Sequence, residues 1–378
     1  MLPAALSFAL VLVLAFLAAA APPDPDEGKW RALPYLQGYR PAQDRPFIVQ
    51  HDPAAVSPGL NLYLSGHAAE AVLIDREGRT LHRWRQPLRR LWPDLASDPR
   101  MAKLEYWRRV WLFPNGDLLA IHEGLGIVKL DARSKVLWSR RGGFHHDLQV
   151  LSDGRIWVLD RKGREGILED FVTVLDPRGR VVRRIPLLRA FERSPFASLL
   201  GRMEKAGDVF HTNTLEVLDG RGSDPAFRKG NVLLSVLKLD ALAVLDPDRE
   251  EIVWAATGSW RRQHQPTLLD DGGLLLFDNL GAGEGRSRVI EIDPRTLQVR
   301  WQYGGFFSKT LGSCQRLPNG NTLITESENG RALEVTRDGR IVWELNNPHR
   351  AGERKELGAV LFEVLRLPES FPFQRQGH

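Results

Sequence analysis

A repeated pattern of strands and turns constrains the fold of this chain more than any other feature of its sequence. In each unit an apolar segment runs into a tight turn, two further apolar segments follow, and a tryptophan-bearing segment closes the unit. The turns contain Asn115-Gly116, Asp153-Gly154, Gly230-Asn231, Asp271-Gly272 and Asn319-Gly320. Because these residue types tolerate positive φ, such pairs between apolar segments indicate β-hairpins. The closing tryptophans are Trp84, Trp138, Trp254, Trp301 and Trp343, with Arg184 in the sixth position.

Units of this kind, at spacings of roughly 40–50 residues, are typical of a β-propeller. The sequence therefore predicts an all-β fold, a six-bladed β-propeller over residues 59–370 with an insertion at about 189–207. The first unit, residues 59–85, contains only three strands. We expect its fourth strand from residues 361–370, so that the N- and C-terminal strands close one blade and remove an exposed sheet edge. Residues 371–378 form a short tail.

The N-terminal residues predict export from the cytoplasm. Residues 1–21 contain no charged side chain, and a run of small residues ends at Pro22. This pattern is typical of a signal peptide, although the segment is also long enough to serve as an uncleaved N-terminal anchor. An extended segment, residues 22–58, follows. We therefore expect a periplasmic or secreted protein that touches a membrane only if residues 1–21 are retained.

Composition excludes several classes of protein. The chain has 378 residues, 43% of them hydrophobic, which is globular, and one cysteine, Cys314. A single cysteine allows no intrachain disulfide and no cysteine-cluster metal site. The net charge of +5 is small for this length and does not indicate a nucleic-acid partner.

The turns also predict which residues meet at the centre of the propeller. Eight residues before the turn glycines lie Arg108, His146, His264 and Gly312, and the HTN sequence places His211 at the same point of its own unit. An isolated histidine is usually a core or turn residue, but three from different units are expected to converge on one axis. Arginine pairs precede three of these strands, at Arg108-Arg109, Arg140-Arg141 and Arg261-Arg262. Such a site favours an anion such as sulfate, phosphate or carboxylate.

At these residues the chain resembles the arylsulfotransferase family. The resemblance depends on HHDLQVLSDG, HTNTLEV and QHQPTLLDDGGLLLFDN, in this order and unit spacing. It implies an exported propeller enzyme that moves a sulfuryl group from a small-molecule aryl sulfate donor to a phenolic acceptor, without a cofactor or metal. By resemblance His264 is the nucleophile that forms a sulfohistidine. His211, Asn213 and His146 then hold sulfuryl oxygens or transfer protons.

The sequence departs from the family pattern at one charged position and leaves alternatives open. Where the family places an arginine after the HTN motif, this chain has Leu237, followed by Lys238. Arg108, Arg141 or Arg262 is expected to supply the missing charge, and Lys238 is a further candidate for binding the anion. Two other functions fit the same residues: a metal-dependent enzyme with His146, His211 and His264 as ligands, and a non-catalytic propeller that binds an anion or a protein.

Overall fold

The computed structural model describes residues 40–98, 104–222, 224–352 and 354–373. The predicted N-terminal segment 1–21, residues 22–39 and most of the tail lie outside the described residues. The described part is built almost entirely of antiparallel sheets, so the all-β prediction is confirmed. Within it, every helix is too short or too polar to cross a membrane.

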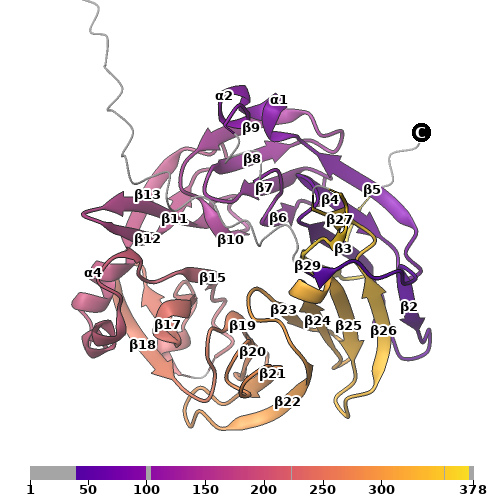
Figure 1. Cartoon of the computed structure of the whole chain (residues 1–378). Coiled ribbons are helices and arrows are strands. Elements are labelled where there is room, and N and C mark those ends of the chain that lie inside the picture. Colours follow the sequence, from indigo (N-terminus) through magenta and orange to yellow (C-terminus); the bar gives the residue numbers. More distant parts are fainter. Residues whose placement is uncertain (1–39, 99–103, 223, 353, 374–378) are drawn as a thin grey trace, which may run out of the picture.

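Most strands belong to sheets of four or five members, arranged around a common centre (Figure 1). In the order in which they follow one another along the chain, the sheets contain β29 (Leu361–Leu367), β3 (Leu60–Ser65), β4 (Glu70–Ile74) and β5 (Thr80–Arg85); β6 (Arg109–Leu112), β7 (Leu118–His122), β8 (Gly126–Leu130) and β9 (Val136–Arg141); β10 (His145–Val150), β11 (Ile156–Arg164), β12 (Ile167–Leu175) and β13 (Val181–Pro186); β15 (Thr212–Val217), β16 (Val232–Val236), β17 (Ala241–Asp246) and β18 (Glu251–Thr257); β19 (His264–Leu268), β20 (Leu274–Asp278), β21 (Ser287–Ile292) and β22 (Val299–Phe306); and β23 (Ser313–Arg316), β24 (Thr322–Glu326), β25 (Arg331–Val335) and β26 (Ile341–Asn346).

A few short elements join these sheets. Strand β14 (Gly207–Asp208) pairs in parallel with β12, and β2 (Ile48–His51) adds an outer strand to β26. A separate small sheet consists of β1 (Arg40–Pro41), β28 (Leu357–Gly358) and β27 (Arg350–Ala351). The helices are α1 (Leu88–Leu91), α2 (Pro93–Ala96), α4 (Leu187–Glu192), η2 (Ala197–Arg202), η3 (Pro225–Phe227), η4 (Leu237–Leu239) and η5 (Ser327–Asn329). Helices α4 and η2 occupy most of the predicted insertion.

The first and last parts of the chain share one sheet, as the sequence predicts. The C-terminal strand β29 pairs antiparallel with β3, with Val364 opposite Tyr63 and Leu367 opposite Leu60. Strand β29 thereby becomes the innermost strand of the sheet that begins the fold (Figure 1). The chain closes into a ring because its last strand completes its first sheet.

The repeated tryptophans connect neighbouring sheets. The indole N–H of Trp84 donates to the carbonyl oxygen of Gly116 at 2.9 Å, and that of Trp301 donates to Arg337 at 2.8 Å. The indole of Trp343 donates to Arg76 at 2.8 Å, across the junction between the last and first sheets. Each of these acceptors belongs to a turn of the next sheet. The tryptophans therefore hold the sheets in register around the centre, which places the ends of the inner strands side by side.

Candidate active site

A small cavity at the centre of the ring is lined by the first residues of the inner strands. Each sheet contributes two consecutive residues, and the first residues of these pairs are Arg108, His146, Asn213, His264, Gly312 and Phe362. Arg108, His146, His264 and Gly312 are the residues that the count from the turn glycines predicts. The regular hairpins explain this agreement, because equal strand and turn lengths bring equivalent residues to the same depth.

The position of His211 differs from the prediction. Asn213 lines the cavity in its place, and His211 lies just before β15 with a φ of 49°. The long connection after β15 prevents a count from the following turn, so the prediction depends on the HTN motif alone and is wrong by two residues. His211 nevertheless reaches the site from the side, because its ring centroid is 4.8 Å from that of His146.

His264 is held in one tautomer by Asn279. The Asn279 Nδ2 donates to the carbonyl oxygens of Ser308 at 2.8 Å and Leu311 at 2.6 Å, so its Oδ1 faces His264. Nδ1 of His264 lies 2.8 Å from that Oδ1 and 3.1 Å from the carbonyl oxygen of Arg262. Both neighbours are acceptors, so Nδ1 carries the proton and Nε2 keeps its lone pair. Burial lowers the pKa of His264 to about 3, so the ring is neutral at pH 7.

His211 is paired with an aspartate that the sequence does not single out. Nδ1 of His211 donates to the Asp208 carboxylate, whose other oxygen accepts the His211 backbone N–H at 2.9 Å. Burial acts to raise the pKa of Asp208, but the His211 imidazole lowers it below its usual range. Burial and the charge of Asp208 together raise the pKa of the neighbouring Asp170 to about 7. The carboxylate of Asp208 thus orients His211 and leaves Nε2 of its ring free to donate or accept a proton.

The third histidine, His146, belongs to a buried polar layer. Its Nδ1 is 2.9 Å from Nδ1 of His145, and its backbone N–H donates to Glu123 at 3.1 Å. Burial, with nearby positive groups, lowers the pKa of His146 well below its usual value, so that its ring is neutral. Arg161 contacts the same Glu123 carboxylate at 3.3 Å. No spacing rule in the sequence points to Glu123 or Arg161, because Glu123 follows β7 and Arg161 lies within β11, both second strands of their sheets.

Arg108 is a buried cation whose guanidinium forms no ion pair or hydrogen bond with any described residue. Its side chain is 8% exposed and lies 5.4 Å from the centroid of the Phe362 ring. Glu123 and Glu363 are near enough to influence its pKa, which burial lowers. A buried guanidinium with free N–H groups beside a cavity is suited to bind an anion.

An ion-pair network closes the cavity on one side. Arg109 forms ion pairs with Asp147, with Nε 2.8 Å from Oδ1, and with Glu363, to which Gln265 also donates a hydrogen bond at 2.9 Å. These residues follow the cavity-lining residues by one position on four of the inner strands. Beyond them lies a larger cavity of 870 Å³, bordered by the hairpin turns. The network is therefore the floor of the histidine site.

A family profile described as Arylsulfotransferase (ASST) matches residues 110–348. The chain belongs to the arylsulfotransferase family. The matched region includes His146, Asn213 and His264, and the match confirms the resemblance that the motifs predict.

Solved structures with similar folds share little sequence with this arylsulfotransferase-family chain. A protein of unknown function from Bacteroides caccae is 12% identical with a TM-score of 0.55, over 82% of this chain and 98% of that one. The Cps50 (Swd1) β-propeller domain of Myceliophteria thermophila is 12% identical with a TM-score of 0.45, over 80% and 90%. A streptogramin B lyase is 12% identical with a TM-score of 0.48, over 88% and 96%. The comparison with curated proteins gave no match.

Three cations predicted to bind the anion lie elsewhere. Arg141 ends the outer strand β9 and is paired with Asp94. Lys238, on η4, forms an ion pair with Glu204 at 2.7 Å. Arg262 is half-buried, does not line the cavity and contributes its backbone carbonyl to His264. The arginine pairs mislead because only Arg108-Arg109 lines the cavity at the start of an inner strand, whereas Arg140-Arg141 ends the outer strand β9. Among the predicted replacements for the family arginine at Leu237, Arg108 alone lines the cavity.

The three histidines do not form a ready metal site. Within the described ranges, the donor atoms of His146, His211 and His264 do not cluster within 4.8 Å of one another, and hydrogen bonds to Asn279 and Asp208 occupy one nitrogen of two of the rings. Two other groups meet that distance, namely Glu123, His145 and His146, and His67, Glu70 and His349. The first group is compact, but an ion pair with Arg161 already compensates the charge of its carboxylate, Glu123.

Proposed function

We propose that this protein is an aryl sulfotransferase that uses Nε2 of His264 as its nucleophile. The observation that carries the proposal is the contact between His264 and Asn279. The Asn279 Oδ1 accepts a hydrogen bond from Nδ1–H, which keeps the proton on Nδ1 and leaves the Nε2 lone pair available. Burial of the ring supports the same role, since a pKa of about 3 keeps the imidazole unprotonated at neutral pH.

In the first half-reaction, Nε2 of His264 attacks the sulfur of an aryl sulfate. An N–S bond forms, the S–O bond to the phenol breaks, and the bonding electrons leave with the phenolate oxygen. His211 donates its Nε2 proton to that oxygen, while Asp208 stabilises the imidazolium before the transfer. The His264 ring becomes cationic, and its Nδ1–H donates a stronger hydrogen bond to Asn279.

In the second half-reaction the sulfuryl group passes from His264 to the acceptor, and the His264 ring becomes neutral again. An acceptor phenol approaches the sulfohistidine. His211 takes the phenolic proton on Nε2, the nitrogen that gave up its proton in the first half-reaction. The phenolic oxygen forms a bond to sulfur, the N–S bond breaks, and its electrons return to Nε2 of His264. Because the donor phenol leaves before the acceptor reacts, this scheme requires ping-pong kinetics.

The sulfuryl oxygens have three candidate partners. Arg108 supplies a guanidinium without an ion-pair partner among the described residues, and His146 supplies the edge of its imidazole. Asn213 supplies Nδ2, which donates one hydrogen bond within the described part of the chain, to the carbonyl oxygen of Gln263 at 2.9 Å. Their positions around one small cavity support a role in stabilising charge on oxygen as the sulfur changes partners. In this proposal Arg108 replaces the family arginine that Leu237 removes.

The proposal also includes the blade count and the location. We interpret the six central sheets as the blades of a six-bladed propeller, and residues 1–21 as the segment that directs export to the periplasm or the exterior. An exported enzyme fits a reaction that uses neither a nucleotide sulfate donor nor a cofactor.

The test is release of nitrophenol from 4-nitrophenyl sulfate by the wild type and by His264→Ala. We expect a burst of one nitrophenol per enzyme, steady release that rises with added phenol, and loss of both in the variant. The control is His82→Ala, because His82 contacts the carbonyl oxygen of Ala132 at 2.7 Å on an outer strand. A folded wild type that binds sulfate at Arg108 without any burst would instead favour the non-catalytic anion-binding function.

A further inference from the structure

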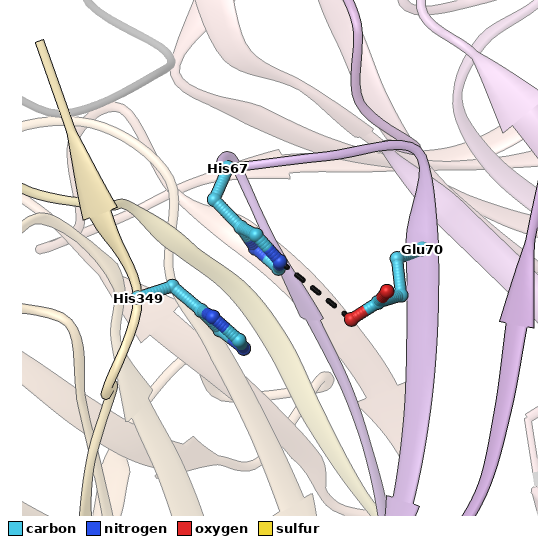
Figure 2. Close-up of side chains that lie close together, drawn as sticks. All are labelled: His67, Glu70 and His349. Atoms are coloured by element: carbon cyan, nitrogen blue, oxygen red, sulfur yellow. Dashed lines mark ion pairs between the residues drawn. The ribbon is translucent and has the colours of Figure 1, made fainter. Parts of the chain in front are cut away.

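A second cluster of metal-ligating side chains lies at the junction of the first and last sheets. His67 follows β3, Glu70 begins β4, and His349 follows β26, so the cluster joins two distant parts of the chain (Figure 2). One donor atom from each side chain lies within 4.8 Å of the others. The rings of His67 and His349 are stacked with centroids 3.5 Å apart, and Nε2 of His67 is 3.6 Å from Glu70 Oε1.

The hydrogen bonds around the cluster leave its donor atoms available. Neither ring nitrogen of His67 is hydrogen-bonded to a described residue, and its Nδ1 is buried. A buried nitrogen without a partner is costly, which a bound ion would relieve. Arg83 and His67 both approach Oε1 of Glu70, so its Oε2 is free among the described contacts.

His349 has the surroundings of a metal-binding histidine. Its Nε2 is 3.0 Å from the hydroxyl oxygen of Tyr63, which can accept the Nε2–H and leave the Nδ1 lone pair for a metal. Burial and the neighbouring His67 lower the pKa of His349 to about 4, so it is neutral at pH 7. Burial acts to raise the pKa of Glu70, but His67 and Arg83 lower it, so this carboxylate is charged.

We propose that His67, Glu70 and His349 bind one divalent transition-metal ion of the zinc type. Two neutral imidazoles and one carboxylate are a common set of protein ligands for such ions, with a water molecule in the fourth position. A metal ion lies in the plane of each imidazole that binds it, so one of the two stacked rings turns about its Cβ–Cγ bond on binding. The bound ion fixes the β3–β4 loop to the segment that follows β26.

The site is independent of the proposed sulfuryl transfer, because none of its residues lines the histidine cavity. It joins residues far apart in the sequence at the point where the ring closes. A crosslink of that kind stabilises the folded state by restricting the unfolded chain, and the effect grows with the length of the loop that it closes.

The test uses the tag-free full chain, freed of metal by chelation and dialysis, with zinc ions as the probe. Zinc affinity is measured by competition with a chromophoric chelator, and thermal unfolding is followed with and without zinc. We expect one zinc per chain and a higher Tm with zinc. In His67→Gln we expect at least a tenfold loss of zinc affinity. The Tm of the metal-free variant should equal that of the metal-free wild type, because this substitution removes a ligand without breaking a hydrogen bond.

The control is His51→Gln, since His51 also lies near a carboxylate, 3.9 Å from Glu77, but has no second histidine beside it. Its zinc affinity should equal that of the wild type. His349→Gln repeats the test from the other loop if His67→Gln does not fold. Cobalt ions, substituted for zinc, should give intense visible absorption in the wild type and in His51→Gln, but not in His67→Gln or His349→Gln. Wild-type zinc affinity in both ligand variants would overturn the proposal, because the ion would then occupy other histidines.

Discussion

The contact between Asn279 and His264 gives the most direct test of the proposed chemistry. Asn279→Ala removes the oxygen that accepts the His264 Nδ1–H and leaves the carbonyl oxygens of Ser308 and Leu311 without their amide donor. The His264 proton can then move to Nε2, which converts the proposed nucleophilic nitrogen into a donor. The variant should therefore bind aryl sulfate normally and form the sulfohistidine slowly.

The size of the effect follows from the charge that develops on the ring. A hydrogen bond to a charged group contributes about 1.5–3 kcal/mol. Because the His264 ring becomes cationic only as sulfur is transferred, most of this stabilisation belongs to the transition state. Since about 1.36 kcal/mol corresponds to a tenfold change in rate, we expect sulfohistidine formation to slow by roughly 10- to 150-fold.

Rapid mixing with excess 4-nitrophenyl sulfate measures this step as the rate of the nitrophenol burst. The control is Asn321→Ala, because Asn321 is also a buried asparagine whose amide donates to Ala55 at 2.9 Å and to Glu334 at 2.7 Å, neither of which is a histidine. It should lose stability but keep the burst rate. A folded Asn279→Ala protein with a wild-type burst rate would refute the assignment of the His264 tautomer.

Three further predictions concern charge and protons. Arg108→Gln should raise the KM for aryl sulfate by about 10- to 100-fold, since a charged hydrogen-bond donor is lost, whereas Arg141→Gln should leave the steady-state kinetics unchanged. Asp208→Asn should lower kcat/KM by about 10²-fold for phenyl sulfate and less for 4-nitrophenyl sulfate, whose phenolate leaves without a proton from His211; equal losses for both esters would contradict general-acid catalysis. Burial lowers the pKa of His122 to about 3, against about 6.5 in the unfolded chain; the unfolded state therefore binds more protons between these values, and stability is lost as pH falls from about 6.5 to 3, at up to about 1.4 kcal/mol per pH unit. Urea unfolding at several pH values should show a shallower dependence in His122→Gln, and an unchanged slope would show that this histidine is not held neutral.

The fold could be predicted because its signals are local. Each hairpin depends on a turn of two or three residues, and every unit but the one with Arg184 has a tryptophan in its closing strand, so the same short signal recurs along the sequence. The pairing of β29 with β3 was also predictable, because the first unit lacks a strand and the end of the chain supplies an unpaired one. Propeller geometry connects these local signals without any detailed knowledge of side-chain packing.

The site could be predicted only where strand and turn lengths are regular. Counting back from a turn glycine locates Arg108, His146 and His264, since each starts a hairpin of standard length. The same reasoning misplaces His211, because the long connection after β15 leaves no turn glycine at the standard distance from the start of that strand. It also cannot locate Asp208, which reaches the site from the two-residue strand β14.

The contact between Arg109 and Glu363 also bears on how the protein is made. These partners are 254 positions apart, and Glu363 belongs to β29, the last strand of the described residues, so it leaves the ribosome long after Arg109. Until that strand is synthesised, Arg109 lacks one of its two carboxylates and the inner edge of β3 is open to other chains. A product that ends before β29 therefore lacks both the closure of the ring and part of the floor beneath the histidines. Synthesis of β29 is in this way a structural condition for the proposed activity, because this one strand supplies both.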